Sequence, residues 1–241
     1  PEHLEPEYRF ERIVKQLQTQ INNHDSIICL QEVSQNWLGP LHSFFNQNDY
    51  HLVTSLYGRA FNGYMGVAIA FPNKRYSLLQ CDVARVADEL KWQQRSGKRP
   101  VGNAQAAADV ACSADEIAAS ESKANTQIVV RLKDDIATQE QEQGQGHVHK
   151  HEFCVSTYHM PCAFRFPYVM SMHSALSLHY VAKMAGDDTP FILAGDFNFD
   201  PRSSCYDLIT SGWCRKGVWV WGWGVWDLVE LGHESWKELN S

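Results

Sequence analysis

The sequence predicts a layered α/β domain, because strand-like apolar segments alternate with helical patterns and three of these segments end in polar residues. These three are residues 27–33, 152–159 and 191–198. The last one carries Asp196 and Asn198 two positions apart, and residues with that spacing share one face of a strand. A packed core holds such a strand rigidly while its end opens to solvent. We therefore expect the chemistry of this domain at the strand ends.

The N-terminal part of the chain predicts a helix followed directly by a strand. Residues 7–21 have an apolar stripe with helical spacing, formed by Phe10, Ile13, Val14, Leu17 and Ile21. A polar break over 22–25 separates this helix from the strand 27–33. A second helix is expected over 38–45, and a pair of strands over 66–71 and 75–79.

The rest of the chain continues the alternation. The strand 128–132 is flanked by 93–123 and 137–150, whose Ala, Ser, Gln and Gly content predicts mobile surface insertions. A helix over 166–185 has an inner face formed by Val169, Met172, Leu176 and Tyr180. The Gly-Asp-Asp-Thr-Pro segment at 186–190 ends this helix before the strand 191–198. Helices alternating with strands in this way indicate a layered domain.

Length and composition are consistent with a single domain over 1–241, since a chain of 241 residues can bury a sizeable core. No apolar run is long enough to cross a bilayer, so no membrane partner is expected. The net charge of −7 argues against a protein that coats nucleic acid, but not against an enzyme that grips a few phosphates through a cation. Seven cysteines without a Cys-x-x-Cys pair indicate reduced thiols in an intracellular compartment: cytoplasm, nucleus or organelle matrix.

The strand-end motifs resemble those of a known family. Ile-Cys-Leu-Gln-Glu-Val at 28–33, Thr-Tyr-His at 157–159 and Gly-Asp-Phe-Asn at 195–198 occur in this order in the endonuclease/exonuclease/phosphatase superfamily, which has the deoxyribonuclease I-like fold. The spacing between the motifs is similar to that of the deadenylase and nocturnin-like branch. The resemblance spans nearly the whole chain and implies a two-layered β-sandwich flanked by helices.

The same resemblance implies a magnesium-dependent phosphodiester hydrolase that acts on RNA or a nucleotide, with Mn²⁺ as an alternative cation. Glu32 is the implied metal ligand, since hard divalent cations prefer carboxylate oxygen. Asp196 is expected to orient or deprotonate the attacking water, and Asn198 to donate to a phosphate oxygen. His159 is expected to face the phosphate and to take part in catalysis.

Each of these four residues also has a purely structural interpretation. Glu32 is consistent with an exposed carboxylate at a strand end, and His159, which precedes Met160-Pro161, is consistent with a core histidine on restricted, extended backbone. Asp196 and Asn198 are both typical turn-forming residues, and for Asn198 the turn and the phosphate contact are compatible.

Both ends of the sequence depart from the family pattern. Family members begin with a strand that ends in a metal-side Asn and finish with a Ser-Asp-His corner that transfers protons, whereas the late pair Asp227 and His233 does not resemble that corner. We therefore expect a fold that is incomplete at both ends and that hydrolyses phosphodiesters weakly or not at all by itself. The alternative function is a catalytically incomplete relative that serves as a structural or assembly component of a larger RNA–protein complex.

Two further patterns remain open. His147, His149 and His151 alternate, so in a strand they share a face that suits a transition metal, although the neighbouring Gln/Gly tract favours a solvated segment. The ribbon of alternating tryptophans at positions 219, 221 and 223 is compatible with base stacking, with protein docking or with burial in the core. We expect it to contact another macromolecule.

Overall fold

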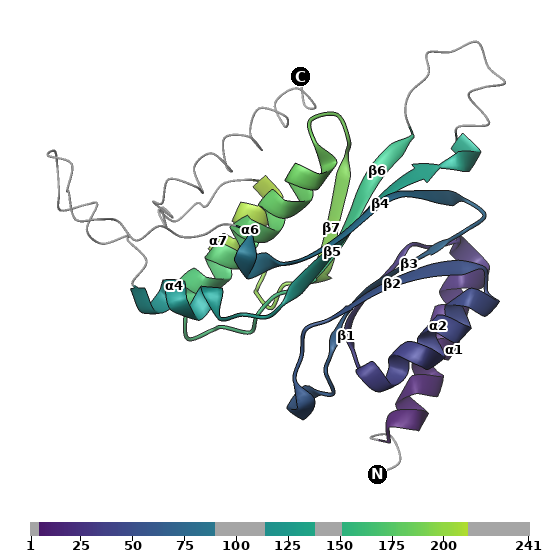
Figure 1. Ribbon diagram of the computed structural model, residues 1–241, viewed down its shortest axis with the longest axis horizontal. Helices are drawn as coiled ribbons and strands as arrows, with labels where there is room; N and C mark the ends of the chain where they lie inside the picture. The colour runs from purple at the N-terminus through teal and green to yellow at the C-terminus, as the bar shows by residue number, and fades with distance from the viewer. Residues whose placement is uncertain (1–4, 90–113, 138–150, 212–241) are drawn as a thin grey trace, which may run out of the picture.

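Two β-sheets pack face to face in the computed structural model, with helices on both outer faces (Figure 1). The structure describes residues 5–89, 114–137 and 151–211. The elements in chain order are α1 (Pro6–His24), β1 (Ile28–Val33), α2 (Gln35–Gln47), β2 (Tyr50–Leu56), the 3₁₀ turn η2 (Ala60–Asn62), β3 (Gly66–Pro72), β4 (Tyr76–Arg85), the 3₁₀ turn η3 (Val86–Asp88), α4 (Ala114–Glu121), β5 (Thr126–Asp134), β6 (Glu152–His159), α6 (Pro167–Ala185), β7 (Phe191–Asp196) and α7 (Ser204–Ser211).

This architecture confirms the predicted two-layered β-sandwich flanked by helices. One sheet has the strand order β1-β3-β2 and is antiparallel, and the other has the order β4-β5-β6-β7, in which β6 and β7 run parallel. Every predicted helix and strand is present, whereas β2, α4 and α7 are additional elements that the sequence patterns did not predict. Among the helices that the structure describes, none is both long and apolar enough to span a membrane.

Part of the predicted insertion 93–123 is a packed helix. Residues 114–121 form α4, and its Ser120 is fully buried. The carbonyl oxygen of Ser120 lies 3.2 Å from Nε2 of His173, which belongs to α6. The helix therefore contacts the outer layer of the four-stranded sheet, while 90–113 and 138–150 lie outside the described residues.

The core between the sheets is built on β3, the central strand of the smaller sheet. Val67, Ile69 and Phe71 point from β3 toward the other sheet, because alternate residues of a strand share a face. The residues that they meet come from β5 and β6 and are Ile128, Val130, Leu132 and Val155. All of these side chains are buried, so this core fixes how the two sheets lie on each other.

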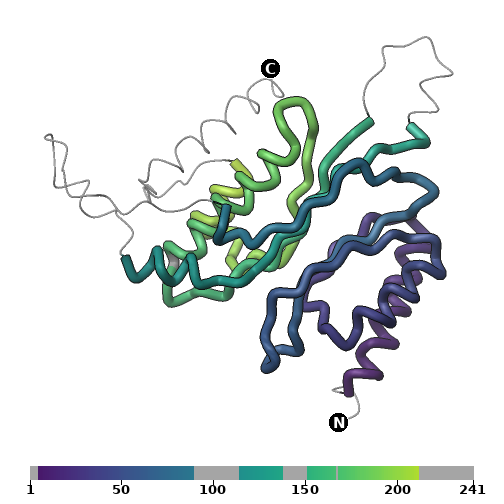
Figure 2. The backbone as a smooth tube through the Cα atoms, in the orientation of Figure 1, coloured from purple at the N-terminus to yellow at the C-terminus, as the bar shows by residue number. Residues whose placement is uncertain are grey.

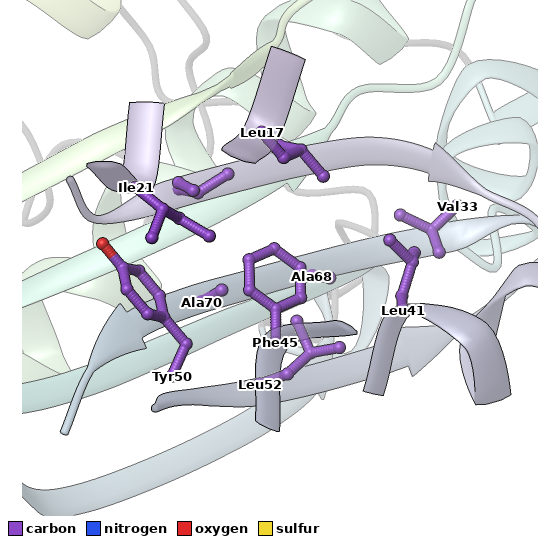
Figure 3. Close-up of a cluster of buried hydrophobic side chains, with 10 residues drawn as sticks. Leu17, Ile21, Val33, Leu41, Phe45, Tyr50, Leu52, Ala68 and Ala70 are labelled. Carbon is purple, nitrogen blue, oxygen red and sulfur yellow. The ribbon is translucent and has the colours of Figure 1, made fainter. Parts of the chain in front are cut away.

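The opposite faces of the sheets are covered by helices. Figure 3 shows Leu17 of α1 and Leu41 and Phe45 of α2 packed over Ala68 and Ala70 of β3. On the other sheet α6 covers β5 and β6, with Tyr180 and Val181 packed against Val129 and Cys154. The backbone trace in Figure 2 shows the resulting order, with the N-terminal helices on one side and the C-terminal helices on the other.

The pairing of β6 with β7 sets the position of the predicted site. Parallel neighbours require a crossover connection, and α6 supplies it between these two strands. The register of the pair places His159 opposite Asp196, at the last position of both strands. Two of the polar strand ends that the sequence singled out therefore lie side by side.

We expect Phe45→Ala to lower the free energy of unfolding by about 3–5 kcal/mol, because Phe45 is fully buried beneath the smaller sheet. Urea denaturation measures the change. Phe61→Ala is the control, since Phe61 is 87% exposed and its removal is expected to change stability by no more than about 0.5 kcal/mol. An equal decrease in the free energy of unfolding for the two variants would contradict the packing of this layer.

Candidate active site

The site lies where β6 and β7 end. Nε2 of His159 is 3.9 Å from Oδ2 of Asp196, and the Asp196 side chain is half exposed whereas the His159 side chain is buried. The imidazole is therefore held within the protein while the carboxylate reaches solvent. This arrangement fits both interpretations of His159, since the ring is a core group that also faces the candidate catalytic carboxylate.

Gly195 allows β7 to approach β6 closely enough for this contact. Its φ angle is 155°, a conformation that L side chains rarely adopt. A Cβ atom at this position would lie 1.9 Å from the carbonyl oxygen of Tyr158, so any side chain here would collide with the backbone of β6. The glycine that precedes Asp196 is thus required by the geometry that places Asp196 beside His159.

The corner after β7 is held by hydrogen bonds of both Asp196 and Asn198. The backbone N–H of Asn198 donates to Oδ1 of Asp196 at 3.0 Å, so Asp196 forms the turn while its Oδ2 faces His159. Nδ2 of Asn198 donates to the carbonyl oxygen of Met160 at 2.8 Å. A side-chain amide nitrogen has two N–H donors, so the second remains for a ligand. Asn198 has a left-handed backbone with a φ of 51°, which asparagine tolerates well.

Glu32 is presented by an irregularity in β1. The pairing of β1 with β3 shifts register between Gln31 and Val33, and Glu32 has a φ angle of 57° in the left-handed region. Such bulges re-aim a side chain at the edge of a sheet and are common next to active sites. Glu32 is exposed, as expected for a residue that binds a hydrated cation.

A hydrogen bond between the sheets ties this bulge to β6. Nε2 of Gln31 donates to Oγ1 of Thr157 at 2.9 Å. Gln31 directly precedes Glu32, and Thr157 lies two residues before His159. The strand that carries the candidate metal ligand is therefore anchored close to the end of the strand that carries the histidine.

Tyr57 and Asn125 belong to the site although the sequence analysis did not select them. The hydroxyl group of Tyr57 lies 2.5 Å from Nδ1 of His159 and also makes a hydrogen bond with the Asn125 side chain. Nδ2 of Asn125 donates to the carbonyl oxygen of His159 at 2.8 Å. Asn125 directly precedes β5, a predicted strand, and this polar position could have identified it, whereas Tyr57 follows β2, which the sequence patterns did not predict.

The pKa of the Tyr57 hydroxyl group depends on charges from both sheets. Burial raises the pKa of its hydroxyl group, and the negative charges of Glu32 and Asp196 raise it further. One carboxylate comes from β1 and the other from β7, so both act on the same hydroxyl group. Glu32 and Asp196 therefore flank a single region of the molecule.

The hydrogen bonds favour one tautomer of His159. Tyr57 remains protonated because its pKa is raised, and its oxygen accepts a hydrogen bond from Asn125. Its O–H is then available to donate to Nδ1 of the neutral imidazole. The ring proton consequently lies on Nε2, the nitrogen that faces Asp196 and the site opening.

The donor set is compatible with a divalent cation that keeps most of its water. Across the described ranges 5–89, 114–137 and 151–211, no group of three or more His, Cys, Asp or Glu residues could hold a metal ion. Mg²⁺ usually takes one or two protein carboxylates together with water and substrate phosphate, and does not need a protein cage. The exposed carboxylate of Glu32 is compatible with that pattern.

Several predictions fall outside the described part of the chain. They concern His147 and His149, the tryptophans of 219–223, and the late pair Asp227 and His233. His151 is described, and its Nε2 is buried without a hydrogen-bond partner among the described residues.

The comparisons with known proteins agree with the fold and with the predicted family. Residues 6–229 match the model of the endonuclease/exonuclease/phosphatase family, so the chain belongs to that family and the predicted resemblance is confirmed. Members of this family generally depend on a divalent metal ion. A search of curated proteins gave no sequence match.

Solved structures of low sequence identity share the fold. ANGEL2, a 2′,3′-cyclic phosphatase solved with adenosine-2′,3′-vanadate, has a TM-score of 0.62 and 21% identity over 87% of this chain and 49% of its own. The human Nocturnin catalytic domain with bound sulfate has a TM-score of 0.60 and 18% identity over 87% of this chain and 63% of its own. Zebrafish (D. rerio) TDP2 in complex with a single-stranded DNA product has a TM-score of 0.51 and 14% identity over 86% of this chain and 60% of its own. The chain thus spans about half the length of ANGEL2.

We expect Tyr57→Phe to remove the preference of His159 for the Nε2–H tautomer, because the variant lacks the hydroxyl group that donates to Nδ1. Ring ¹⁵N chemical shifts should report a single Nε2–H tautomer at neutral imidazole in the parent chain and a mixture in the variant. Tyr64→Phe is the matched control, since Tyr64 is an exposed tyrosine of the same loop region. An unchanged ¹⁵N spectrum of His159 in Tyr57→Phe would contradict this hydrogen bond.

We expect Gly195→Ala to separate the ends of β6 and β7, because the added Cβ collides with the carbonyl oxygen of Tyr158. Amide hydrogen exchange should accelerate at Asp196 and at Met160, whose N–H donates to the carbonyl oxygen of Asp196 at 2.9 Å. Gly39→Ala in α2 provides the comparison, since its added Cβ meets no atom within 4 Å and its backbone is helical. Exchange at Asp196 and Met160 that is as slow in Gly195→Ala as in Gly39→Ala would contradict this expectation.

Proposed function

We propose that this chain carries the catalytic face of a magnesium-dependent phosphodiester hydrolase that resembles RNA 3′-exonucleases and deadenylases. The observation that carries the proposal is the convergence of His159, Asp196 and Asn198 at the end of β6 and β7. Family membership supports the reaction class, because the family comprises nucleases and phosphatases. The proposed reaction is attack of water on a phosphodiester.

Each side chain has a role that follows from its contacts. Asp196 has one oxygen engaged in the turn and is half exposed, so its carboxylate can align a water molecule and accept its proton. Nε2–H of His159 is oriented by Tyr57 and can donate to a phosphate oxygen. Asn198 can donate its second amide N–H to the same phosphate.

Glu32 is the residue proposed to hold the cation, which is Mg²⁺ or alternatively Mn²⁺. When bound, a divalent cation supplies positive charge that stabilises the phosphate as negative charge develops. The bulge at Glu32 and the Gln31–Thr157 hydrogen bond would hold the carboxylate toward the end of β6.

The proposed substrate is RNA or a nucleotide phosphodiester, and the proposed setting is an intracellular, reducing compartment. ANGEL2 was solved with an adenosine-2′,3′-vanadate and TDP2 with a DNA product, which is consistent with nucleotide substrates in this fold. Five described cysteines are free thiols, which is consistent with a reducing environment. The competing proposal is that the chain is a non-catalytic relative that acts within a larger RNA–protein complex.

We expect slow hydrolysis of a poly(A) oligonucleotide by the chain, dependent on Mg²⁺ and abolished by EDTA. Glu32→Gln should abolish the turnover that Mg²⁺ supports, and Asp196→Asn should also abolish turnover. Asp187→Asn is the matched control, because Asp187 is an exposed carboxylate in the turn that precedes β7.

Two outcomes would count against this function. The first is hydrolysis that persists in both EDTA and Asp196→Asn, which would place the chemistry elsewhere. The second is the absence of any turnover that depends on Mg²⁺, which would favour the assembly role in an RNA–protein complex.

A further inference from the structure

A fully buried histidine lies between α6 and two segments that lead to the candidate site. This residue is His173 of α6. Its Nδ1 lies 2.7 Å from the hydroxyl oxygen of Tyr158, the residue that precedes His159 on β6. Its Nε2 lies 3.2 Å from the carbonyl oxygen of Ser120, near the end of α4. Both ring nitrogens of His173 therefore have a partner outside α6.

The two contacts require one tautomer of His173. A carbonyl oxygen only accepts hydrogen bonds, so Nε2 of His173 must carry the proton that it donates to Ser120. Burial, together with the positive charges of Lys123 and Arg85, lowers the pKa of His173 to about 4, so the ring is neutral at neutral pH. Burial also raises the pKa of the Tyr158 hydroxyl group, which donates to the lone pair of Nδ1. The imidazole thus links β6 to α4 by two directed hydrogen bonds.

The contact with Tyr158 has good geometry for a hydrogen bond. The planes of the Tyr158 and His173 rings lie within 2° of each other, and their centroids are 6.4 Å apart. The hydroxyl group therefore meets Nδ1 close to the plane of the imidazole, where the lone pair of that nitrogen lies.

The end of α4 is also held by Arg85. Nη1 of Arg85 donates to the carbonyl oxygen of Glu121 at 2.9 Å and to that of Lys123 at 3.2 Å. The last carbonyl groups of a helix have no partner within the helix, so His173 and Arg85 supply donors from outside it. Since α4 lies against α6 (Figure 1), these donors fix where the last turn of α4 and the residues after it lie.

The chain that leaves α4 runs directly to the candidate site. Asn125 lies five residues after Ser120, and its carbonyl oxygen accepts a hydrogen bond from the backbone N–H of Val86 at 3.2 Å. Nδ2 of Asn125 donates to the carbonyl oxygen of His159 at 2.8 Å, and the Asn125 side chain also makes a hydrogen bond with the hydroxyl group of Tyr57. A shift of the last turn of α4 would therefore move a side chain that contacts both Tyr57 and His159.

We propose that His173 is a positioning residue for His159, and that it acts through Tyr158 on β6 and through the end of α4. The inference rests on the proposed function and adds to it a buried group that holds the end of β6 from the side of α6. A packing role alone would need only an apolar ring of similar size. Instead, each nitrogen of this imidazole bonds to a segment that leads to the site.

Two substitutions of His173 test the proposal. His173→Phe keeps an aromatic ring but removes both the donor and the acceptor, whereas His173→Gln keeps one N–H donor and one carbonyl acceptor. In His173→Phe, the ring ¹⁵N shifts of His159 should report a mixture of tautomers. The backbone N–H of Val86 should exchange about two- to tenfold faster, the factor that one hydrogen bond of typical strength provides. His173→Gln should return both measurements toward the parent values.

Two tyrosine variants separate positioning from a general loss of stability. Tyr158→Phe removes only the contact through β6, so it should alter the ring shifts of His159 and leave the exchange of Val86 unchanged; it also decides the proposal if His173→Phe does not fold. Tyr180→Phe is the matched control, because Tyr180 is a buried tyrosine whose hydroxyl group donates to Oδ2 of Asp82 on β4 at 2.9 Å. It should leave both measurements at the parent values.

Turnover distinguishes the failure of this inference from the failure of the proposed function. His173→Phe should lower kcat/KM for poly(A) by the same factor as it accelerates the exchange of Val86, and His173→Gln should recover most of that loss. A parent chain without turnover that depends on Mg²⁺ would overturn the proposed function, while the ¹⁵N and exchange measurements would still decide whether His173 positions His159. Parent-like shifts of His159 in both His173→Phe and Tyr158→Phe, or equal changes in Tyr180→Phe, would overturn the inference.

Discussion

The packing of β3 against β5 and β6 is the constraint on which the rest of the structure depends. The β3 side chains that face the other sheet are Val67, Ile69 and Phe71, and their burial fixes how one sheet lies over the other. The candidate site draws Glu32 from one sheet and His159 from the other, so neither sheet could form it alone. The Gln31–Thr157 hydrogen bond adds a directional contact near the site to an otherwise non-directional apolar interface.

Within the larger sheet, β6 and β7 can approach each other closely because Gly195 has no side chain. The missing side chain of Gly195 allows parallel pairing up to the last residue, which places Asp196 beside His159. Tyr57 then holds the imidazole from the opposite sheet, and its raised pKa keeps it a donor. Tyr57, which follows a strand of the sheet that carries Glu32, thus orients the imidazole of His159. The imidazole faces the carboxylate of Asp196, which belongs to the same sheet as His159.

Much of this arrangement could be predicted from residues at strand ends. Apolar runs that stop at Glu32, His159 and Asp196 reveal both the strands and their polar termini, because burial and exposure change abruptly there. Tyr57 could not be predicted in the same way, since the strand before it, β2, mixes polar and apolar residues and has no clear pattern. The surface depression that Phe164 and Tyr206 line beside Asp196 could not be predicted either, because the two residues are far apart in sequence and are brought to one place only by the packing of α6 and α7.

Paramagnetic broadening by Mn²⁺ tests the central claim, that residues of both sheets form one cation-dependent phosphate site. With substoichiometric Mn²⁺, the account predicts selective loss of the amide signals of Glu32, Tyr57, His159, Asp196 and Asn198. The signals of Asp187, in the turn that precedes β7, should persist, and Glu32→Gln should restore the lost signals. Broadening confined to one sheet, or unchanged in Glu32→Gln, would contradict the account.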